Sequence, residues 1–274
     1  MNQLIHLRAV ASQLQQAALE AVDTAEAVYQ AITRVGDQIL IDEQAYQLRN
    51  FDRVFIAGVG KAAVPMADAV AEVLRDQLSR GIVITKYRHI DRSLAGSIRV
   101  YEAGHPLPDE NSVNATRDLV DLLRQATPRD LIFCAISGGG SALMTLPAEG
   151  LTLIDLQATT QLLLRAGATI HQINAIRKHL DLIKGGGLAR LANGATIVSL
   201  ILSDVIGDDL SVIASGPTAP DPSTFAEAWQ AIVQFDLIDQ LPAAVRARLE
   251  FGRAGQLPDT PKPGDAIFDR VQNI

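Results

Sequence analysis

The chain of 274 residues is long enough to form one large domain or two small ones. Hydrophobic residues make up 48% of it and charged residues 20%, which predicts a sizeable core and excludes global disorder. The net charge of -7, from 24 Lys and Arg against 31 Asp and Glu, disfavours a nucleic-acid-binding function.

The predicted elements alternate between helices and strands. Apolar residues at helical spacing predict a long first helix over residues 7–35 and a shorter helix over 42–50. Short apolar runs predict strands at 53–57, 81–85, 97–103, 131–136 and 195–202. Further helices are predicted at 62–78, 109–125, 152–166 and 224–234. This alternation predicts an α/β fold, a three-layer α/β/α Rossmann-like domain around a mainly parallel sheet.

The end of the chain differs in composition. Residues 1–240 are expected to form the α/β domain, and residues 241–274 a linker that leads into a further domain. Four prolines fall between Pro242 and Pro263, which is typical of a linker or an irregular loop. A helix-like stretch at 265–274 then stops without a cap, so we expect the chain to continue.

Targeting signals are not apparent. The N-terminus lacks a basic start followed by a compact apolar block, as a secretory signal peptide would have. No apolar run approaches the roughly 20 residues of a membrane-spanning helix. The single cysteine, Cys134, lies within an apolar run and is expected to be a core residue. These features favour a cytoplasmic protein with no membrane partner.

Ligands of open parallel sheets bind beyond the carboxyl ends of the strands, so the turns after the strands carry the candidate residues. The turn after the fourth predicted strand consists of Ser137, Gly138, Gly139, Gly140 and Ser141. Adjacent glycines let backbone N–H groups converge, and a helix start behind them favours a bound phosphate or carboxylate. A loop that needs positive φ angles and binds nothing is the alternative.

A second glycine turn follows the first predicted strand. Gly58, Gly60 and Ala63 satisfy a loose form of the dinucleotide-binding pattern, but the next strand ends at Lys86 without the acid that this pattern requires. Lys61 stands at a helix start beside these glycines. Its ammonium group is suited to meeting a phosphate or a carboxylate there.

Two candidate bases lie in the proline-flanked loop before the helix at 109–125. His105 is one of them, and a local hydrogen bond is its alternative role. Asp109 supplies oxygens at the helix start, either as a base or as an N-cap.

The segment 165–190 is basic within an acidic chain, with five Lys or Arg residues against one acid, Asp181. Asn174 and Arg177 share a predicted helix, and Lys184 precedes three glycines. Positive charge beside glycine-rich backbone favours contact with a polyanion. A solvated helix face is the alternative.

The fifth predicted strand is followed by a further polar stretch. It ends at Asp204, whose carboxylate is a candidate Mg²⁺ ligand together with water. Ser215 and Gly216 form another tight polar turn and are candidate phosphate or substrate contacts. Capping and turn formation are the alternatives for each of them.

Five ordered motifs are GVGKA at 58–62, HPLPDENS at 105–112, SGGGSAL at 137–143, NAIRKHLDLIKGGGLA at 174–189, and SDV with SGPT at 203–218. Together they resemble the N-terminal domain of the class II glycerate 2-kinases, the family whose C-terminal half is called the MOFRL domain. The resemblance implies ATP-dependent phosphorylation of D-glycerate at its 2-hydroxyl, giving 2-phosphoglycerate. It also implies an active site between this domain and a second α/β domain, so the chain alone is expected to be inactive.

The resemblance implies roles for the candidate residues. The turn of residues 137–141 cradles a phosphate or the substrate carboxylate, and Lys61 neutralises charge on the transferring group. Arg177 and Lys184 assist, and Asp204 binds Mg²⁺. ATP and Mg²⁺ are the implied cofactors, glycerate and a nucleotide are the implied ligands, and a homodimer forms if the first helix packs against a neighbour.

Two other functions stay open. One is an NADPH-dependent hydroxypyruvate reductase, a label that members of this family have carried, with Gly58 and Gly60 on the pyrophosphate and Lys86 near the 2′-phosphate. The other is a noncatalytic domain that binds a phosphosugar at its Gly/Ser turns. Tight NADPH binding favours the first, and phosphosugar binding without any need for ATP favours the second.

Overall fold

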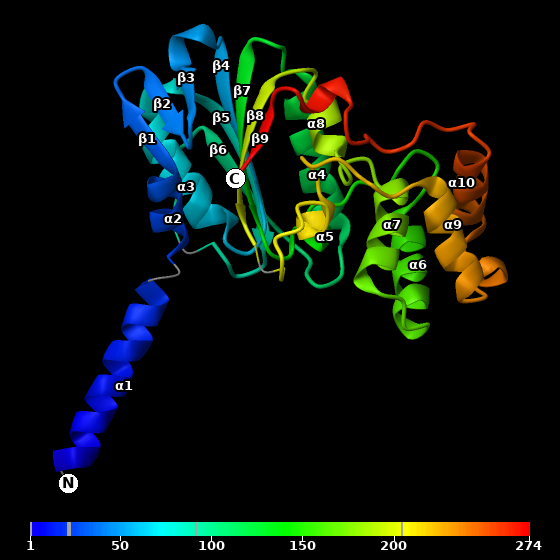
Figure 1. Ribbon diagram of the computed structural model, residues 1–274, viewed down its shortest axis with the longest axis horizontal. Helices are drawn as coiled ribbons and strands as arrows, with labels where there is room; N and C mark the ends of the chain where they lie inside the picture. Colours follow the sequence, from blue (N-terminus) through cyan, green and yellow to red (C-terminus); the bar gives the residue numbers. More distant parts are fainter. Residues whose placement is uncertain (1, 21–22, 91, 204) are drawn as a thin grey trace.

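The computed structural model describes residues 2–20, 23–90, 92–203 and 205–274. Its centre is a six-stranded parallel sheet in the order β6-β5-β4-β7-β8-β9 (Figure 1). The strands are β4 (Arg53–Val59), β5 (Leu78–Lys86), β6 (Ile98–Ala103), β7 (Asp130–Ser137), β8 (Thr196–Leu202) and β9 (Val271–Asn273). The predicted α/β class is confirmed, and all five predicted strands belong to this sheet.

The order of the strands reverses at the centre of the sheet. From β4 the chain moves outward through β5 to β6, and it then returns to β7 on the other side of β4. From β7 it moves outward again to β8 and β9. In doubly wound sheets, ligands bind at such a switch point, beyond the carboxyl ends of the two central strands. Both glycine turns found in the sequence leave the sheet at this position.

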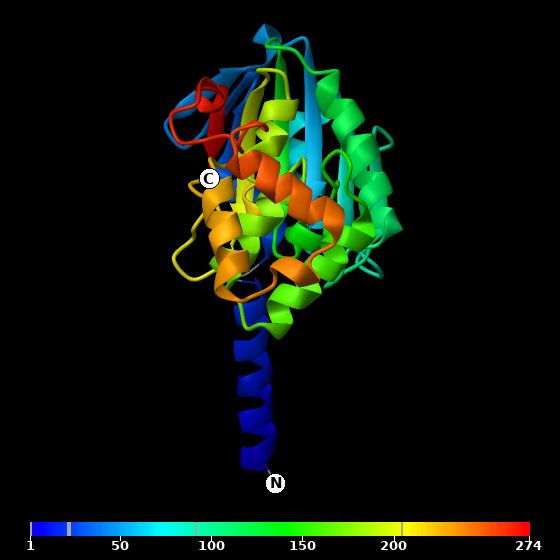
Figure 2. The ribbon, with the colours of Figure 1, turned by 90° about the vertical axis from the view of Figure 1, so that its right-hand side faces the viewer.

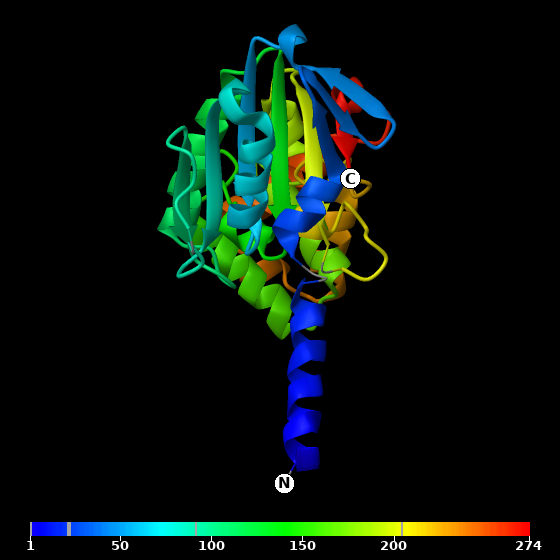
Figure 3. The same cartoon turned by 90° about the vertical axis from the view of Figure 1, so that its left-hand side faces the viewer.

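Helices cover both faces of the sheet. One face carries α4 (Glu110–Arg124), α5 (Gly140–Leu143) and α8 (Gly187–Leu191), and the other carries α2 (Thr24–Ala31) and α3 (Ala63–Leu74) (Figures 1 and 3). Successive residues of a strand point to opposite faces. In β7, Ile132 and Cys134 therefore enter the core with α4, whereas Leu131 and Phe133 enter the core with α3. The expected three layers and the core position of Cys134 are confirmed.

A three-stranded antiparallel meander lies beside α2 (Figure 3). Its elements are β1 (Ile32–Val35), β2 (Gln38–Ile41) and β3 (Gln44–Gln47), followed by the 3₁₀ helix η1 (Leu48–Asn50). The single helix predicted over 7–35 is instead two helices, Asn2–Glu20 and Thr24–Ala31, and Asp23 is the N-cap of the second. The helix predicted over 42–50 is wrong. Ile39 and Ile41 are fully buried against the core around α3, so tertiary packing outweighs the local helix propensity of this segment.

Four helices form a group to one side of the sheet (Figure 2). They are α6 (Leu153–Arg165), α7 (Ile170–Leu180), α9 (Phe225–Gln234) and α10 (Ala243–Arg253). Their apolar faces enclose a third core around Leu163 and Ile232. A buried ion pair between Lys178 Nζ and Asp221 Oδ1, at 3.0 Å, ties α7 to the segment before α9. Since α7 carries Asn174 and Arg177, this tether also fixes two candidate site residues.

The C-terminal segment is part of the folded domain. Helix α10 packs on α9, and the 3₁₀ helix η5 (Ala266–Phe268) leads into β9, which pairs with β8. The helix predicted at 265–274 is therefore wrong. Residues 241–274, which were expected to form a linker, contribute a helix and a strand to the folded domain. The other 3₁₀ helices are η2 (Arg75–Gln77), η3 (Ile213–Ser215) and η4 (Ile238–Gln240).

The first helix, α1 (Asn2–Glu20), projects from the rest of the domain (Figures 1, 2 and 3). Its apolar residues Leu7 and Leu14 have 57% and 67% of their surface exposed. A homodimer that packs through α1 stays a prediction. Within the described part of the chain, no helix combines the length and apolarity that crossing a bilayer requires.

Candidate functional site

The turns after β4 and β7 are pressed together at the carboxyl edge of the sheet. Gly60 has a φ of +128°, and a Cβ atom there would lie 2.5 Å from the carbonyl oxygen of Ser137. The Lys61 N–H donates to the Gly138 carbonyl at 3.0 Å, and the Ala62 N–H donates to Ser137 Oγ at 3.0 Å. A residue without a side chain is required at position 60, and two hydrogen bonds join the two turns.

The backbone of the β4 turn is engaged within the fold. The Gly60 N–H donates to the Ile84 carbonyl at 3.1 Å, and the next two N–H groups donate to the β7 turn. Gly58 lies inside the strand, where an added Cβ atom would be 2.9 Å from a methyl group of Val83. These glycines therefore allow close packing, which differs from the phosphate contact expected of Gly58 and Gly60.

The β7 turn borders two basic side chains. A Cβ atom at Gly139 would lie 3.0 Å from His105 Cδ2 and 3.3 Å from Lys61 Cε. The N–H groups of Gly140 and Ser141 open α5 and have no acceptor within that helix. Because α5 has four residues, its dipole adds little, and the attraction for an anion depends on these amides and on Lys61. The Lys61 ammonium has no ion-pair partner among the described residues.

A chain of polar side chains runs from this turn into the protein. Ser141 Oγ lies 2.8 Å from Ser215 Oγ, and Ser215 donates to Asn174 Oδ1 at 3.2 Å. Ala214 and Ser215 have φ angles of +50° and +62°, a costly conformation that is concentrated at functional sites. The structure thus brings together Ser141, Asn174 and Ser215. Gly216 is buried and anchors the same turn through its backbone.

Lys184 lies beneath the site. It is 3% exposed, and its ammonium group donates to Asp181 Oδ2 at 2.6 Å, the Met144 carbonyl at 3.0 Å and Thr145 Oγ1 at 3.3 Å. Three acceptors match its three protons, so the group is held within the fold, unlike the anion contact expected for it. Burial lowers the pKa of Lys184, although Asp181 acts in the opposite direction. Lys184 therefore positions the segment between α7 and α8 against the β7 turn.

Arg177 lies beside this ion pair. It lines a pocket of about 30 Å³ together with Ser141, Thr160, Asp181 and Lys184. Burial lowers the pKa of the Arg177 guanidinium, with partial compensation from Asp181. A pocket of this volume holds one or two water-sized groups, so a ligand would place one polar end in it rather than enter whole.

Asp109 acts as an N-cap. Its Oδ1 accepts from the Ser112 N–H at 2.9 Å, and its Oδ2 accepts from the Tyr87 hydroxyl at 2.7 Å. Partial burial acts to raise the pKa of Asp109, but these hydrogen bonds hold it below its ordinary value. With both oxygens engaged, this carboxylate is a poor proton acceptor, so the capping alternative fits better than the base.

The predicted magnesium ligand, Asp204, lies outside the described residues. In the part of the chain that the structure describes, no group of three or more His, Cys, Asp or Glu side chains could hold a metal ion. A protein-only metal centre is therefore not formed by these residues. Mg²⁺ in phosphoryl-transfer sites is commonly held by one or two carboxylates together with substrate phosphates.

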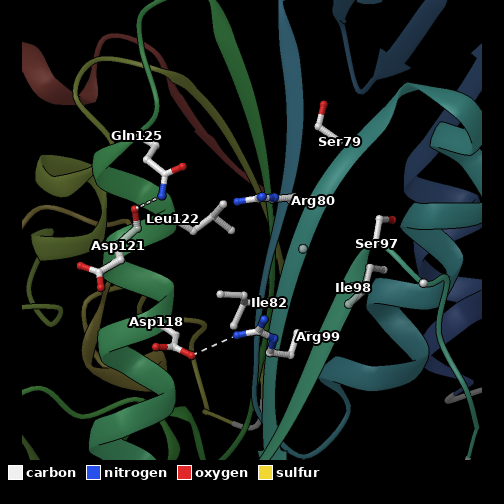
Figure 4. A pocket seen from close by; sticks show the side chains of 12 residues that line it. Ser79, Arg80, Ile82, Ser97, Ile98, Arg99, Asp118, Asp121, Leu122 and Gln125 are labelled. Atoms are coloured by element: carbon white, nitrogen blue, oxygen red, sulfur yellow. Dashed lines mark hydrogen bonds and ion pairs between the residues drawn. The ribbon is translucent and has the colours of Figure 1, made fainter.

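A much larger hollow lies at the opposite edge of the sheet (Figure 4). Its volume is about 660 Å³, and it is bounded by the first halves of β5 and β6 and the end of α4. Arg80 reaches into it from β5, and Arg99 pairs with Asp118 at 3.3 Å. None of the predicted site residues lines this hollow. We place the site at the carboxyl edge, where the glycine turns converge.

Asp181 is the contributor that sequence analysis did not assign. It accepts from Lys184, from the Leu146 N–H at 3.1 Å and from the Ile183 N–H at 2.9 Å. It is the single acid of the basic segment 165–190, and that isolation was a signal for a buried ion pair.

The chain is similar in sequence to a described family and to several named proteins. Residues 10–250 match the family described as a domain of unknown function, DUF4147. The chain is similar to a glycerate 2-kinase of Pyrococcus horikoshii, with 41% identity over 256 residues that cover 93% of this chain and 57% of that protein. It is also similar to a protein of Agrobacterium vitis named as a hydroxypyruvate reductase, with 45% identity over 213 residues. That match covers 78% of this chain and 47% of the relative.

The fold is similar to that of a solved protein. A crystal structure of a glycerate kinase from Thermotoga maritima superposes with a TM-score of 0.81 and 36% identity. The superposition covers 98% of this chain and 58% of that one. The chain thus spans about half the length of the curated relatives it matches.

Proposed function

The chain belongs to the DUF4147 family, and on that premise we propose that it forms the part of a glycerate 2-kinase that holds the acid substrate and the transferring phosphoryl group. The proposed reaction transfers the γ-phosphoryl group of ATP to the 2-hydroxyl of D-glycerate and yields 2-phosphoglycerate. One observation carries the proposal. Two glycine turns meet at the switch point of a parallel sheet, and beside them lies the ammonium group of Lys61, which has no ion-pair partner in the described part of the chain.

Phosphoryl transfer requires positioning and charge neutralisation more than covalent help from the protein. In the proposed mechanism, Lys61 neutralises charge on the transferring group, and the amides of Gly140 and Ser141 donate to its oxygens. His105 borders the same turn and is the remaining candidate for taking the proton of the 2-hydroxyl, since Asp109 caps a helix.

ATP and Mg²⁺ are part of the proposal. The described residues offer no carboxylate cluster for the ion, so we propose that Mg²⁺ comes with the nucleotide and meets one carboxylate, for which Asp204 is the candidate. When bound, the ion supplies charge neutralisation at the nucleotide phosphates.

A nicotinamide-dependent reductase fits the geometry less well. A bound pyrophosphate needs free N–H groups after the first strand, but those of Gly60, Lys61 and Ala62 are engaged within the fold. The strand β5 ends at Lys86 without an acid for the ribose of NADH, so this end suits only the 2′-phosphate of NADPH. The reductase name therefore stays with the Agrobacterium relative.

The test uses the protein expressed from its full reading frame. D-glycerate and ATP with Mg²⁺ are supplied, and the product is identified by ³¹P NMR, which separates 2-phosphoglycerate from 3-phosphoglycerate. We expect 2-phosphoglycerate. Oxidation of NADPH in the presence of hydroxypyruvate, with no phosphorylated acid formed, would favour the reductase. Phosphosugar binding with no turnover of ATP would favour the noncatalytic domain.

A further inference from the structure

Arg177 is a partly buried cation that forms no ion pair with any residue that the structure describes. It lies on α7 and lines the pocket that also contains Ser141 and Thr160. Its Nε–H faces Thr160 Oγ1 at 3.5 Å, which is a weak contact. No carboxylate of the described residues lies within 4 Å of its guanidinium group. Charged groups removed from water are normally paired, and the carboxylate that lines this pocket, Asp181, pairs with Lys184 rather than with Arg177.

The charges around the pocket leave one positive charge in excess. Lys184 and Asp181 neutralise each other through their 2.6 Å ion pair. Asp181 also accepts two backbone hydrogen bonds, so its oxygens are engaged away from Arg177. Asp181 therefore offsets the charge of the guanidinium group only in part, and a singly charged anion in the pocket would restore neutrality.

A second donor lies about one helical turn before Arg177 on α7. Asn174 precedes Arg177 by three residues on α7, so the two side chains share a face of the helix. Asn174 is 3% exposed, and its Oδ1 accepts from Ser215. Its Nδ2 group has no acceptor among the described residues. An amide group without an acceptor inside the protein is available to donate to a ligand.

The two cations lie near different residues of one turn. Gly139 borders Lys61, whereas Ser141, two residues later, lines the pocket of Arg177. A small molecule that spans this turn can therefore meet one cation at each end. The planar fork of an arginine matches the two oxygens of a carboxylate, whereas a lysine acts as a point charge toward a phosphoryl group.

We infer that the site binds the two ends of its substrate separately, with Arg177 and Asn174 on the carboxylate of a small hydroxy acid and Lys61 on the phosphoryl group. This inference rests on the proposed function and adds to it the residue that selects for an acid. The ligand class is a short-chain monoanionic 2-hydroxy acid, whose carboxylate enters the pocket first.

Isothermal titration of the 274-residue chain tests the inference with D-glycerate and with glycerol, in which a hydroxymethyl group replaces the carboxylate. We expect binding of D-glycerate and much weaker binding of glycerol. Arg177→Gln should lower the affinity for D-glycerate by about tenfold or more and leave the affinity for glycerol unchanged. Arg177→Lys keeps the positive charge but loses the planar guanidinium group. Its affinity for D-glycerate should therefore lie between those of the unaltered chain and Arg177→Gln. Arg165→Gln, at an exposed position on α6, is the matched control and should bind as the unaltered chain does.

The outcomes separate the inference from the proposed function. Equal affinity of the unaltered chain and Arg177→Gln for D-glycerate, at matched thermal stability, would overturn the inference while kinase activity stood. Failure of the unaltered chain to bind D-glycerate would also overturn it, since the pocket lies within this chain. Selectivity for the acid that depends on Arg177, with no phosphorylation by the protein expressed from the full reading frame, would support the carboxylate site and contradict the proposed kinase function.

Discussion

The two edges of the parallel sheet differ in how their charged side chains are paired. At the amino edge, Arg53 holds the buried Asp130 through two hydrogen bonds of 3.0 and 2.6 Å. At the carboxyl edge, neither Lys61 nor Arg177 has a carboxylate partner among the described residues. The amino edge nevertheless has the larger hollow. We therefore propose the binding site from the partly buried Arg177, which the fold leaves without an ion pair among the described residues, and not from the volume of a hollow that is lined by the exposed Arg80.

This comparison predicts opposite effects of two classes of substitution on stability and on ligand binding. Changes at the amino edge should lower stability and leave ligand binding intact, whereas changes of unpaired cations at the carboxyl edge should do the reverse.

The largest effect is expected from Gly60→Ala, which forces the two turns of the carboxyl edge apart. The new Cβ atom would meet the Ser137 carbonyl at 2.5 Å on a backbone with φ of +128°. We expect a loss of about 3–5 kcal/mol in the free energy of unfolding, combining backbone strain with overpacking. Urea unfolding measures it. Gly36→Ala, with φ of +62° and nothing within 4 Å, is the control and should cost only about 1–2 kcal/mol. Equal losses would show that the contact between the turns is unimportant.

If the proposed function holds, Lys61→Ala should lower kcat of the protein expressed from its full reading frame by about 10²–10³-fold, on the order of 3–4 kcal/mol, as for loss of an electrostatic group in the transition state. Its unfolding midpoint should not move, because the ammonium has no partner among the described residues. Lys86→Ala, in the neighbouring strand end, serves as the control. Turnover by Lys61→Ala at the unaltered rate would remove Lys61 from the mechanism.

Asp130→Asn should destabilise the protein by about 2 kcal/mol, because it removes a buried partner of Arg53. Partial exposure of Arg53 keeps this cost below that of a fully buried pair. Affinity for D-glycerate should stay the same. Asp52→Asn breaks the exposed pair with Arg129 and should cost less than about 1 kcal/mol. A change in glycerate affinity with Asp130→Asn would contradict the separation of the two edges.

The smallest effect concerns pH. Burial acts to raise the pKa of Asp130, but Arg53 and Thr127 hold it below its ordinary value of 3.8. A depressed folded-state pKa gives stability that is present above the unfolded-state value and is lost as the pH falls through the folded-state value. The stability difference between the unaltered protein and Asp130→Asn should therefore shrink below about pH 4. A difference that stays constant from pH 6 to pH 3 would argue against this ion pair as its source.

Much of the fold followed from local patterns in the sequence. Strands of the central sheet are continuous apolar runs, since parallel strands are buried on both faces, and the turns between them are rich in glycine. The meander was missed because the segment before β4 contains good helix formers, yet Ile39 and Ile41 are buried by pairing with partners far along the chain. Strand β9 has three residues and is defined by its pairing with β8, a partner that no local pattern reveals.

The candidate site was predicted in its parts but not in its division of roles. Glycine spacing identified both turns, but spacing does not show which backbone N–H groups the fold itself uses, as it does at Gly60. The sequence grouped Arg177 and Lys184 as similar cations. Their roles differ because Asp181 turns toward Lys184 and leaves Arg177 unpaired, which is a consequence of tertiary packing.

Amide chemical shifts of the ¹⁵N-labelled chain during titration with D-glycerate test the central claim most directly, since they report both edges at once. We predict that the largest shifts occur at Gly139, Ser141 and Arg177, while the amides of Arg80 and Ser97 in the larger hollow do not move. Shifts centred on Arg80 and Ser97, with the glycine turns unaffected, would contradict the placement of the site at the carboxyl edge.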